Sequence, residues 1–221
     1  MSFQRARNDE QREIRRRAIL DTAAAMLDEM PVADVGLNEL SRRVGLAKSN
    51  VLRYFESREA VLLELLDYFL RNWLAELAGE LAAGVDPGRP AVDRAGRLAD
   101  VLSRSLADRP VLCDLFNAQG GVLEHNVSVE VVRRHKRDSL ESLGALAELV
   151  RRHVPELGDG ATFFCLQVMV LAGALSAYSP PPASVLAVYE ADPALAVFHL
   201  DLHEALRITV TTTILGALPR V

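Results

Sequence analysis

The chain has 221 residues, a formal net charge of −5 at neutral pH and 50% hydrophobic residues, so it can bury a substantial core. The negative charge excludes a uniformly basic coat for nucleic acid, although a local basic patch remains compatible with it. The two cysteines, Cys113 and Cys165, stand in apolar surroundings at a spacing that fits neither a metal knuckle nor a redox pair. We therefore expect two buried free thiols.

The amino-terminal residues form a basic arm. Within residues 1–17, six arginines stand against three acidic residues: Arg5, Arg7, Arg12, Arg15, Arg16 and Arg17 against Asp9, Glu10 and Glu13. The opening MSFQRARNDEQ lacks the apolar run of a secretory signal, and we expect a cytoplasmic protein.

Helical periodicity extends along almost the whole chain. Apolar residues recur three and four positions apart, strand-like alternation is missing, and Pro and Gly cluster at the breaks. The pattern predicts an all-α protein with about nine helices, at residues 10–29, 37–44, 48–54, 58–82, 92–107, 110–119, 127–153, 160–178 and 195–216.

The stretch from Ala161 to Tyr178 carries no charge over 18 residues, which reaches the threshold for a membrane span. Polar Thr162, Gln167 and Ser176 interrupt it, and basic flanks are missing. We expect a buried core or interface helix there, and no membrane association.

Residues 37–55, LNELSRRVGLAKSNVLRYF, predict two short helices joined by a tight turn. Leu40 and Val44 form one apolar pair at i, i+4, Val51 and Phe55 form a second, and Gly45 can adopt the left-handed backbone between them. Helices this short need a shared core with the preceding helix. The spacing therefore indicates a helix-turn-helix.

The second of these helices has a polar side suited to DNA. Arg53 can pair with guanine and Asn50 with adenine, while Lys48, Ser49 and Tyr54 can donate to phosphate oxygens. Asn38, in the preceding helix, completes the set of candidate DNA contacts. The alternative is an ordinary solvated face on a three-helix subdomain.

The run LNELSRRVGLAKSNVLRYFESREAVLLELL, Leu37 to Leu66, resembles the helix-turn-helix of the TetR family of transcriptional regulators. The residues that follow the family pattern are Leu40, Gly45, Leu46, Asn50, Val51, Tyr54, Phe55, Arg58 and Glu59. RRRAILDTAAAMLDEM is similar to the family's first helix. Departures are Ala47 in place of a capping Ser, Leu52 in place of a Tyr that commonly touches DNA, and Gly36 in place of a capping Thr.

The resemblance implies a helix-turn-helix DNA-binding domain at residues 1–56 and a larger helical ligand-binding and dimerisation domain at residues 57–221. It implies a homodimer formed through the helices near 160–178 and 195–216, a double-stranded DNA operator, and an unidentified small-molecule effector. On this resemblance we expect a repressor that the effector releases from the operator. Candidate effector contacts pair apolar bulk with a few polar groups: Phe69, Trp73, Leu112, Phe116, Asn117 and Gln167.

An enzyme or metal site has weaker support. His199 and His203 would lie at i, i+4 on one helical face, with Asp201 and Glu204 beside them, but the HEXXH pattern and a third ligand are missing. Hydrolase and phosphate-loop signatures are also missing, so we expect neither catalysis nor a cofactor. The remaining alternative function is a protein-interaction or ligand-carrier module with a non-functional helix-turn-helix.

Overall fold

The computed structural model describes residues 2–219, with side chains from residue 10 onward, and every regular element in this part of the chain is helical. The predicted all-α class is therefore confirmed. The α-helices are α1 (Ser2–Leu27), α2 (Leu37–Arg43), α3 (Lys48–Val51), α4 (Arg58–Gly84), α5 (Ala91–Ala107), α6 (Pro110–Ala118), α7 (Val129–His153), α8 (Gly160–Ser176), α9 (Ala183–Ala191) and α10 (Leu202–Ala217).

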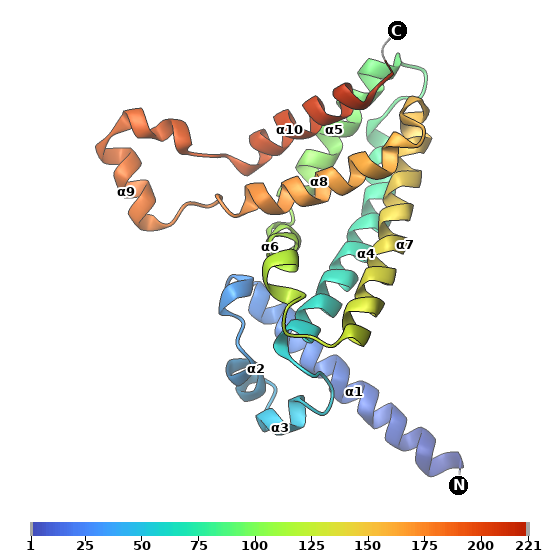
Figure 1. The fold of residues 1–221 in the computed structure, drawn as a ribbon, viewed down its shortest axis with the longest axis vertical. Coiled ribbons are helices and arrows are strands. Elements are labelled where there is room, and N and C mark those ends of the chain that lie inside the picture. The colour runs from blue at the N-terminus through green and yellow to red at the C-terminus, as the bar shows by residue number, and fades with distance from the viewer. Residues whose placement is uncertain (1, 220–221) are drawn as a thin grey trace.

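Helices α1, α2 and α3 form a small head at one end of the molecule (Figure 1). Its centre contains the buried side chains of Ile19, Leu40, Val51 and Phe55, as the apolar spacing predicts. Gly45 links α2 to α3 with a φ of 70°, a backbone conformation that is open to glycine at little cost. The side chains of Arg5 and Arg7 in the predicted basic arm lie outside the described part of the structure.

The body is built on two long helices, α4 and α7, which pack side by side (Figure 1). The hydroxyl of Ser57 caps α4 by accepting a hydrogen bond from the amide of Ala60. Helix α6 packs on α8, and α5 packs on α10. Both α5 and α6 also contact α4. Helix α4 contacts α1 of the head and α5, α6 and α7 of the body, so it connects the two.

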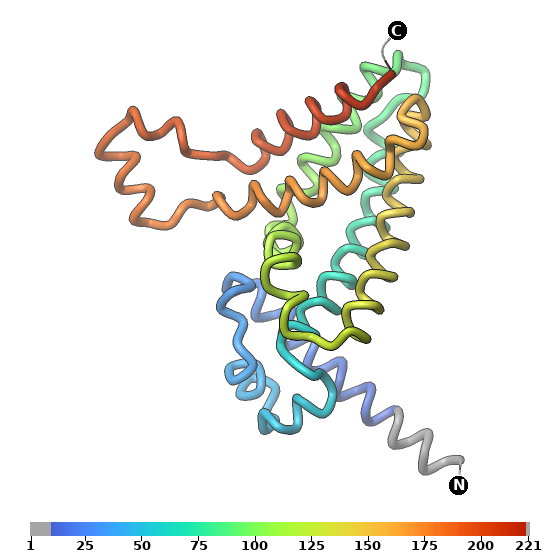
Figure 2. The backbone as a smooth tube through the Cα atoms, viewed as in Figure 1, coloured from blue at the N-terminus to red at the C-terminus, as the bar shows by residue number. Residues whose placement is uncertain are grey.

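The segment between α8 and α10 projects from the body as an arm, which we define as residues 177–201 (Figure 2). It contains α9 and the 3-10 helix η4 (Pro193–Phe198), and neither element has a buried residue. The predicted helix at 195–216 is wrong in its first part. Pro193 and the side-chain cap of Asp192 set η4 apart, and Asp201 caps a new helix by accepting from the amide of Glu204.

Helix α9 was missed because its nine residues are almost uniformly apolar and lie between proline-containing segments, so they show no amphipathic period. Among the residues that the structure describes, no helix is both long and apolar enough to cross a membrane. Helix α8 instead buries one side against the core, through Phe164, Val168 and Ala172.

Both cysteines are free and buried, as expected. Cys113 lies in α6, where its thiol faces the carbonyl of Leu106 at 3.4 Å, and Cys165 lies in α8. Burial in apolar surroundings raises the pKa of each thiol to about 12. Neither group is a nucleophile at neutral pH.

Candidate nucleic-acid interface and open cavity

Helix α3 has an apolar side and a polar side. Val51 is fully buried and Phe55 is 4% exposed, so this pair anchors the segment to the head. The surface of the head carries the six residues predicted to contact DNA, five of them exposed and Tyr54 half-buried: Asn38, Lys48, Ser49, Asn50, Arg53 and Tyr54. Their position at the surface is the geometry that a groove-reading helix needs, and their individual roles stay predictions.

The recognition segment is less regular than predicted. The α-helix ends at Val51, and the next residues continue as turns in which Arg53 and Tyr54 donate to carbonyls three residues back. Ala47 offers no side-chain cap, as predicted, and its carbonyl accepts from the amides of Asn50 at 2.8 Å and Val51 at 3.2 Å. A four-residue helix without a cap depends on the packing of Val51 for its stability.

Helix α1 adds basic residues beside this segment. A groove of about 350 Å³ between α1 and the end of the recognition segment is lined by Gln11, Arg12, Arg15, Arg53 and Tyr54. Arg12 and Arg15 were recognised only as part of the basic arm. Their place beside Arg53 depends on how α1 crosses the head, which the sequence pattern does not specify.

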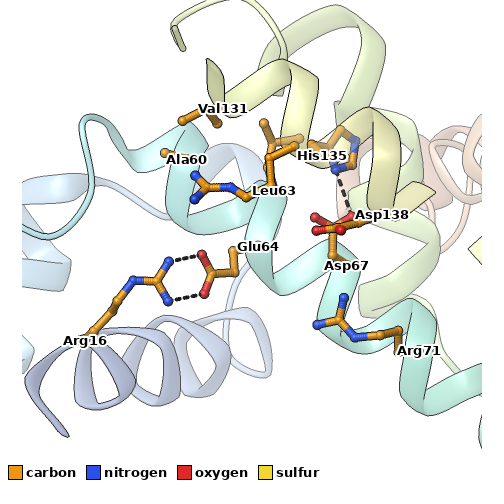
Figure 3. A pocket seen from close by; sticks show the side chains of 10 residues that line it. Arg16, Ala60, Leu63, Glu64, Asp67, Arg71, Val131, His135 and Asp138 are labelled. Atoms are coloured by element: carbon orange, nitrogen blue, oxygen red, sulfur yellow. Dashed lines mark hydrogen bonds and ion pairs between the residues drawn. The ribbon is translucent and has the colours of Figure 1, made fainter. Parts of the chain in front are cut away.

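Another arginine of α1 has a structural role. Arg16 donates to both carboxylate oxygens of Glu64 on α4 (Figure 3). Its guanidinium group also lies 4.7 Å from the ring centroid of Phe55. Arg16 therefore ties α1 to the recognition segment and to α4 at the same time.

The arginines of α2 are held by acidic neighbours. Glu39 accepts hydrogen bonds from Arg42 and Arg43, and Arg43 also donates to Glu29. These bonds, first that from Arg42 and then that from Arg43, lower the pKa of Glu39 to about 2. The positive charge of α2 is thus compensated within the head.

The body contains an open pocket of about 590 Å³ between α6, α7 and α8, which we call the cavity; its wall includes Leu140 and Val170, which are 68% and 61% exposed. This volume is within the range of small-molecule sites. Most of its wall is apolar: Phe116, Leu140, Leu143, Leu166, Met169, Val170 and Ala174. Polar side chains also contribute: Asn117, Gln119, Glu124, Lys136 and Ser139.

Two of the six predicted effector contacts, Phe116 and Asn117, line this cavity. The other four do not belong to its wall. Trp73 is 1% exposed and its indole nitrogen donates to the hydroxyl of Ser105 at 3.0 Å, while Leu112 is 2% exposed in the core. Phe69 packs against the same core, and Gln167 is half-buried on α8.

Sequence reasoning missed the polar end of the cavity. It lies where α6 passes into a π-helix, η2 (Gln119–Leu123). Glu124 follows, and one of its oxygens accepts from Lys136 Nζ at 2.6 Å and from Gln119 Nε2 at 3.0 Å. Burial opposes ionisation of Glu124, but the bonds from Lys136 and Gln119 outweigh it and lower the pKa of this carboxyl. The Gly-Gly pair after Gln119 was read only as a helix break.

A buried histidine connects this polar end to α4. His135 is 2% exposed, and its Nδ1 lies 2.8 Å from Oδ1 of Asp67 (Figure 3). Its Nε2 lies 3.0 Å from Nε2 of Gln119 and 3.4 Å from the hydroxyl of Ser139. Because the amide nitrogen of Gln119 donates, Nε2 of His135 accepts and Nδ1 carries the proton toward Asp67. Burial raises the pKa of Asp67, and the bond from His135 offsets part of that effect.

The expectation that His199 and His203 lie on one helical face is wrong. Helix α10 begins at Leu202, so His199 precedes it, and its ring stacks on Tyr189 of the arm with centroids 5.8 Å apart. Within the described residues, no three His, Cys, Asp or Glu side chains gather in a way that could hold a metal ion.

Comparison with known proteins identifies the family of this chain. Residues 19–65 match the family model described as bacterial regulatory proteins, tetR family, and residues 67–221 match a tetracyclin repressor-like C-terminal domain. The HTH-type transcriptional regulator EthR of Mycobacterium tuberculosis is 44% identical over 50 residues, a match that spans 23% of each chain. The chain thus matches less than a quarter of that relative's length.

Solved structures agree on the fold. The Thermus thermophilus repressor FadR in complex with lauroyl-CoA has a TM-score of 0.54 at 19% identity, over 93% of this chain and 96% of the other. A tetR-family regulator from Mesorhizobium loti has a TM-score of 0.53 at 12% identity, over the same shares. With a head built as a helix-turn-helix and a C-terminal match that covers most of the chain, this protein belongs to the TetR family of transcriptional regulators, which are not enzymes.

Proposed function

We propose that this chain is a homodimeric, sequence-specific DNA-binding regulator, a repressor that a small molecule releases from its operator. The observation that carries DNA binding is the two-sided recognition segment, in which Val51 and Phe55 are buried while Lys48, Asn50 and Arg53 are exposed. On this proposal Arg53 and Asn50 read base edges, and the remaining polar residues and the α1 arginines contact phosphates. Such a regulator works in the cytoplasm, where bacterial DNA is found.

Dimerisation through α8 and α10 is supported by the apolar side chains that one copy leaves in water. Phe163 of α8 is 64% exposed and Ile208 of α10 is 53% exposed. The arm adds Val197 at 79% and Phe198 at 69%. A monomer rarely exposes so many large apolar residues on adjacent elements, and a second copy would cover them. Two heads can then reach successive turns of DNA, about 34 Å apart.

Release by a small molecule is supported by the cavity between α6, α7 and α8. It joins a mostly apolar wall to a short polar end, the composition of a typical ligand site. The Thermus thermophilus repressor of the same fold was solved in complex with lauroyl-CoA, which supports a small-molecule ligand here. The boundary between residues 56 and 57, proposed as the division between DNA-binding and effector domains, falls just before α4.

Fluorescence anisotropy tests the proposal with a duplex from the protein's own upstream region and a scrambled duplex of equal length, each at several salt concentrations. We expect selective binding to the upstream duplex that weakens steeply as salt rises. Equal affinity for both duplexes would contradict sequence-specific regulation. Absence of binding to either would favour the ligand-carrier alternative once selection from random duplexes also fails.

A further inference from the structure

The polar end of the cavity already holds a carboxylate, and it comes from the protein itself. Oε1 of Glu124 accepts from both Lys136 and Gln119, so the two donors converge on one oxygen. A charged ammonium and an amide N–H aimed at the same point form a receptor for an anionic oxygen. The rest of the wall that faces this point is largely apolar.

Glu124 occupies this receptor from a place where the backbone is irregular. It ends the π-helix η2, and residues 125–128 connect it to α7 without regular structure. π-Helical turns are rare and are common at functional sites. The side chain of Glu124 is 21% exposed, so it reaches water by a small rotation. Its carboxylate can therefore leave the receptor without being stranded in an apolar interior.

We propose that the effector is an amphipathic carboxylate whose head group replaces Glu124 at Lys136 and Gln119, while its apolar body lies along Leu143 and Met169. This inference rests on the proposed function and names the chemistry of its effector. An exchange of one carboxylate for another leaves Lys136 paired and returns Glu124 to solvent. A cationic head group at this point would face the ammonium of Lys136, whose side chain is 54% exposed, and a neutral one would form no charge-assisted bond with it.

The same exchange reaches the DNA-binding head through His135. The amide of Gln119 serves two acceptors, Glu124 and Nε2 of His135, so Gln119 can follow a new carboxylate only by weakening its bond to the histidine. His135 in turn holds Asp67 on α4. One helical turn away, Glu64 holds Arg16 of the head. His135 is thus a positioning residue between the cavity and the attachment of α1.

Calorimetric titration of the full chain, without DNA, tests the head-group chemistry with dodecanoate, dodecanol and dodecylamine below their micelle concentrations. We expect dodecanoate to bind at least about tenfold more tightly than either of the others. Lys136→Met should weaken dodecanoate about tenfold and leave dodecanol unchanged. Arg137→Met, on the same helix but outside the cavity wall, is the matched control and should change neither.

The variant Glu124→Gln distinguishes competition for Lys136 from a purely structural role of Glu124. Removing the charge that competes for Lys136 should make dodecanoate bind roughly fivefold more tightly. Equal binding of dodecanol and dodecanoate, or weaker dodecanoate binding by Glu124→Gln, would overturn the inference. This titration contains no DNA, so a negative result would contradict the effector chemistry and not the proposed DNA binding. In the same way, a negative DNA-binding experiment would leave the titration result valid.

The role of His135 is tested by nuclear magnetic resonance of its imidazole ring. In protein labelled with ¹⁵N-histidine, saturating dodecanoate should shift the Nε2 resonance of His135, which is assigned by its loss in His135→Phe. Gln119→Leu should shift the same resonance without any carboxylate. A Nε2 resonance that stays in place at saturation would contradict the link from the cavity to α4. Where His135→Phe unfolds, the wild-type resonance is assigned by elimination, through single substitutions of the other four histidines.

Discussion

A Cβ atom at Gly173 of α8 would lie 2.7 Å from the amide nitrogen of Asn117 in α6, so the two helices touch there through their backbones. We expect Gly173→Ala to force these helices apart and to lower the free energy of unfolding by about 1 to 3 kcal/mol. Urea denaturation measures the change. Because α6 and α8 both line the cavity, the variant should also alter dodecanoate binding.

Gly144 in α7 provides the control, since a Cβ there would meet no other atom within 4 Å. Gly144→Ala should raise the free energy of unfolding by about 0.5 to 1 kcal/mol, because alanine loses less backbone entropy in a helix. If both variants stabilised the protein equally, the close approach of α6 and α8 would be wrong.

Substitutions of four basic residues of the head should have two kinds of effect on DNA binding, one specific to a base pair and one common to all sequences. Arg53→Ala should relax discrimination at one base pair by about 1 to 3 kcal/mol, whereas Lys48→Ala should weaken all sequences alike. Arg12→Ala and Arg15→Ala should each reduce the salt slope by about 1 if, as proposed, each side chain contacts a phosphate. Anisotropy with the selected duplex and single-base variants measures both effects.

Arg97 on α5, whose side chain is 72% exposed, serves as the control for these substitutions. Arg97→Ala changes the net charge by the same amount but lies on the body, so the salt slope should stay as in the wild type. Loss of affinity equal to that of Arg12→Ala would show that the head arginines act only through net charge.

The arm and α8 should contribute to one dimer interface. Phe163→Asp and Phe198→Asp each place a charge on a large exposed apolar side chain, and we expect each to raise the dimer dissociation constant at least about tenfold. Val129, 74% exposed on α7, gives the control Val129→Asp, which should leave the dimer intact. Light scattering over a concentration series measures the constants, and a monomeric wild type at micromolar concentration would contradict the proposed dimer.

The helix-turn-helix could be predicted from sequence because its signals are local, although α3 ends earlier than expected, at Val51. The i, i+4 pairs, Gly45 and Ala47 fix two helices, a turn and a missing cap within 20 residues. Most body helices were also placed within a few residues. The polar end of the cavity could not be predicted, because Glu124, Lys136 and His135 meet only through the packing of the π-helix against α7 and α4.

The arm shows the second limit. Periodicity predicts a helix where one side is buried and the other exposed. Helices α9 and η4 bury neither side within one chain, so their apolar sequence shows no helical period. Four of the six predicted effector contacts lie outside the cavity wall for a related reason. Trp73 and Leu112 have the composition of a ligand wall, yet the same composition suits the core in which they lie.

Acid should weaken the head through Glu39. Its folded pKa of about 2 lies below the ordinary value of 4.5, so its ion pairs stabilise the native state fully above about pH 4.5. The contribution is lost as the pH falls from there toward 2. We expect Glu39→Gln to lower Tm at pH 7 and to leave Tm near the wild-type value at pH 2 to 2.5, as measured by circular dichroism. A Tm difference that persisted unchanged to the acid limit would exclude ionisation as its cause.

The two buried thiols should report global opening of the body. With pKa values raised to about 12 by burial, Cys113 and Cys165 hold almost no thiolate at pH 8 and have no path to a bulky reagent. Labelling by 5,5′-dithiobis(2-nitrobenzoate) should therefore be slow in native protein and fast in urea. Since Cys113 lies in α6 and Cys165 in α8, loosening by Gly173→Ala should accelerate native-state labelling of both, whereas Gly144→Ala should not. Rapid labelling of one thiol in the folded wild type would contradict its burial and with it the close packing of α6 on α8.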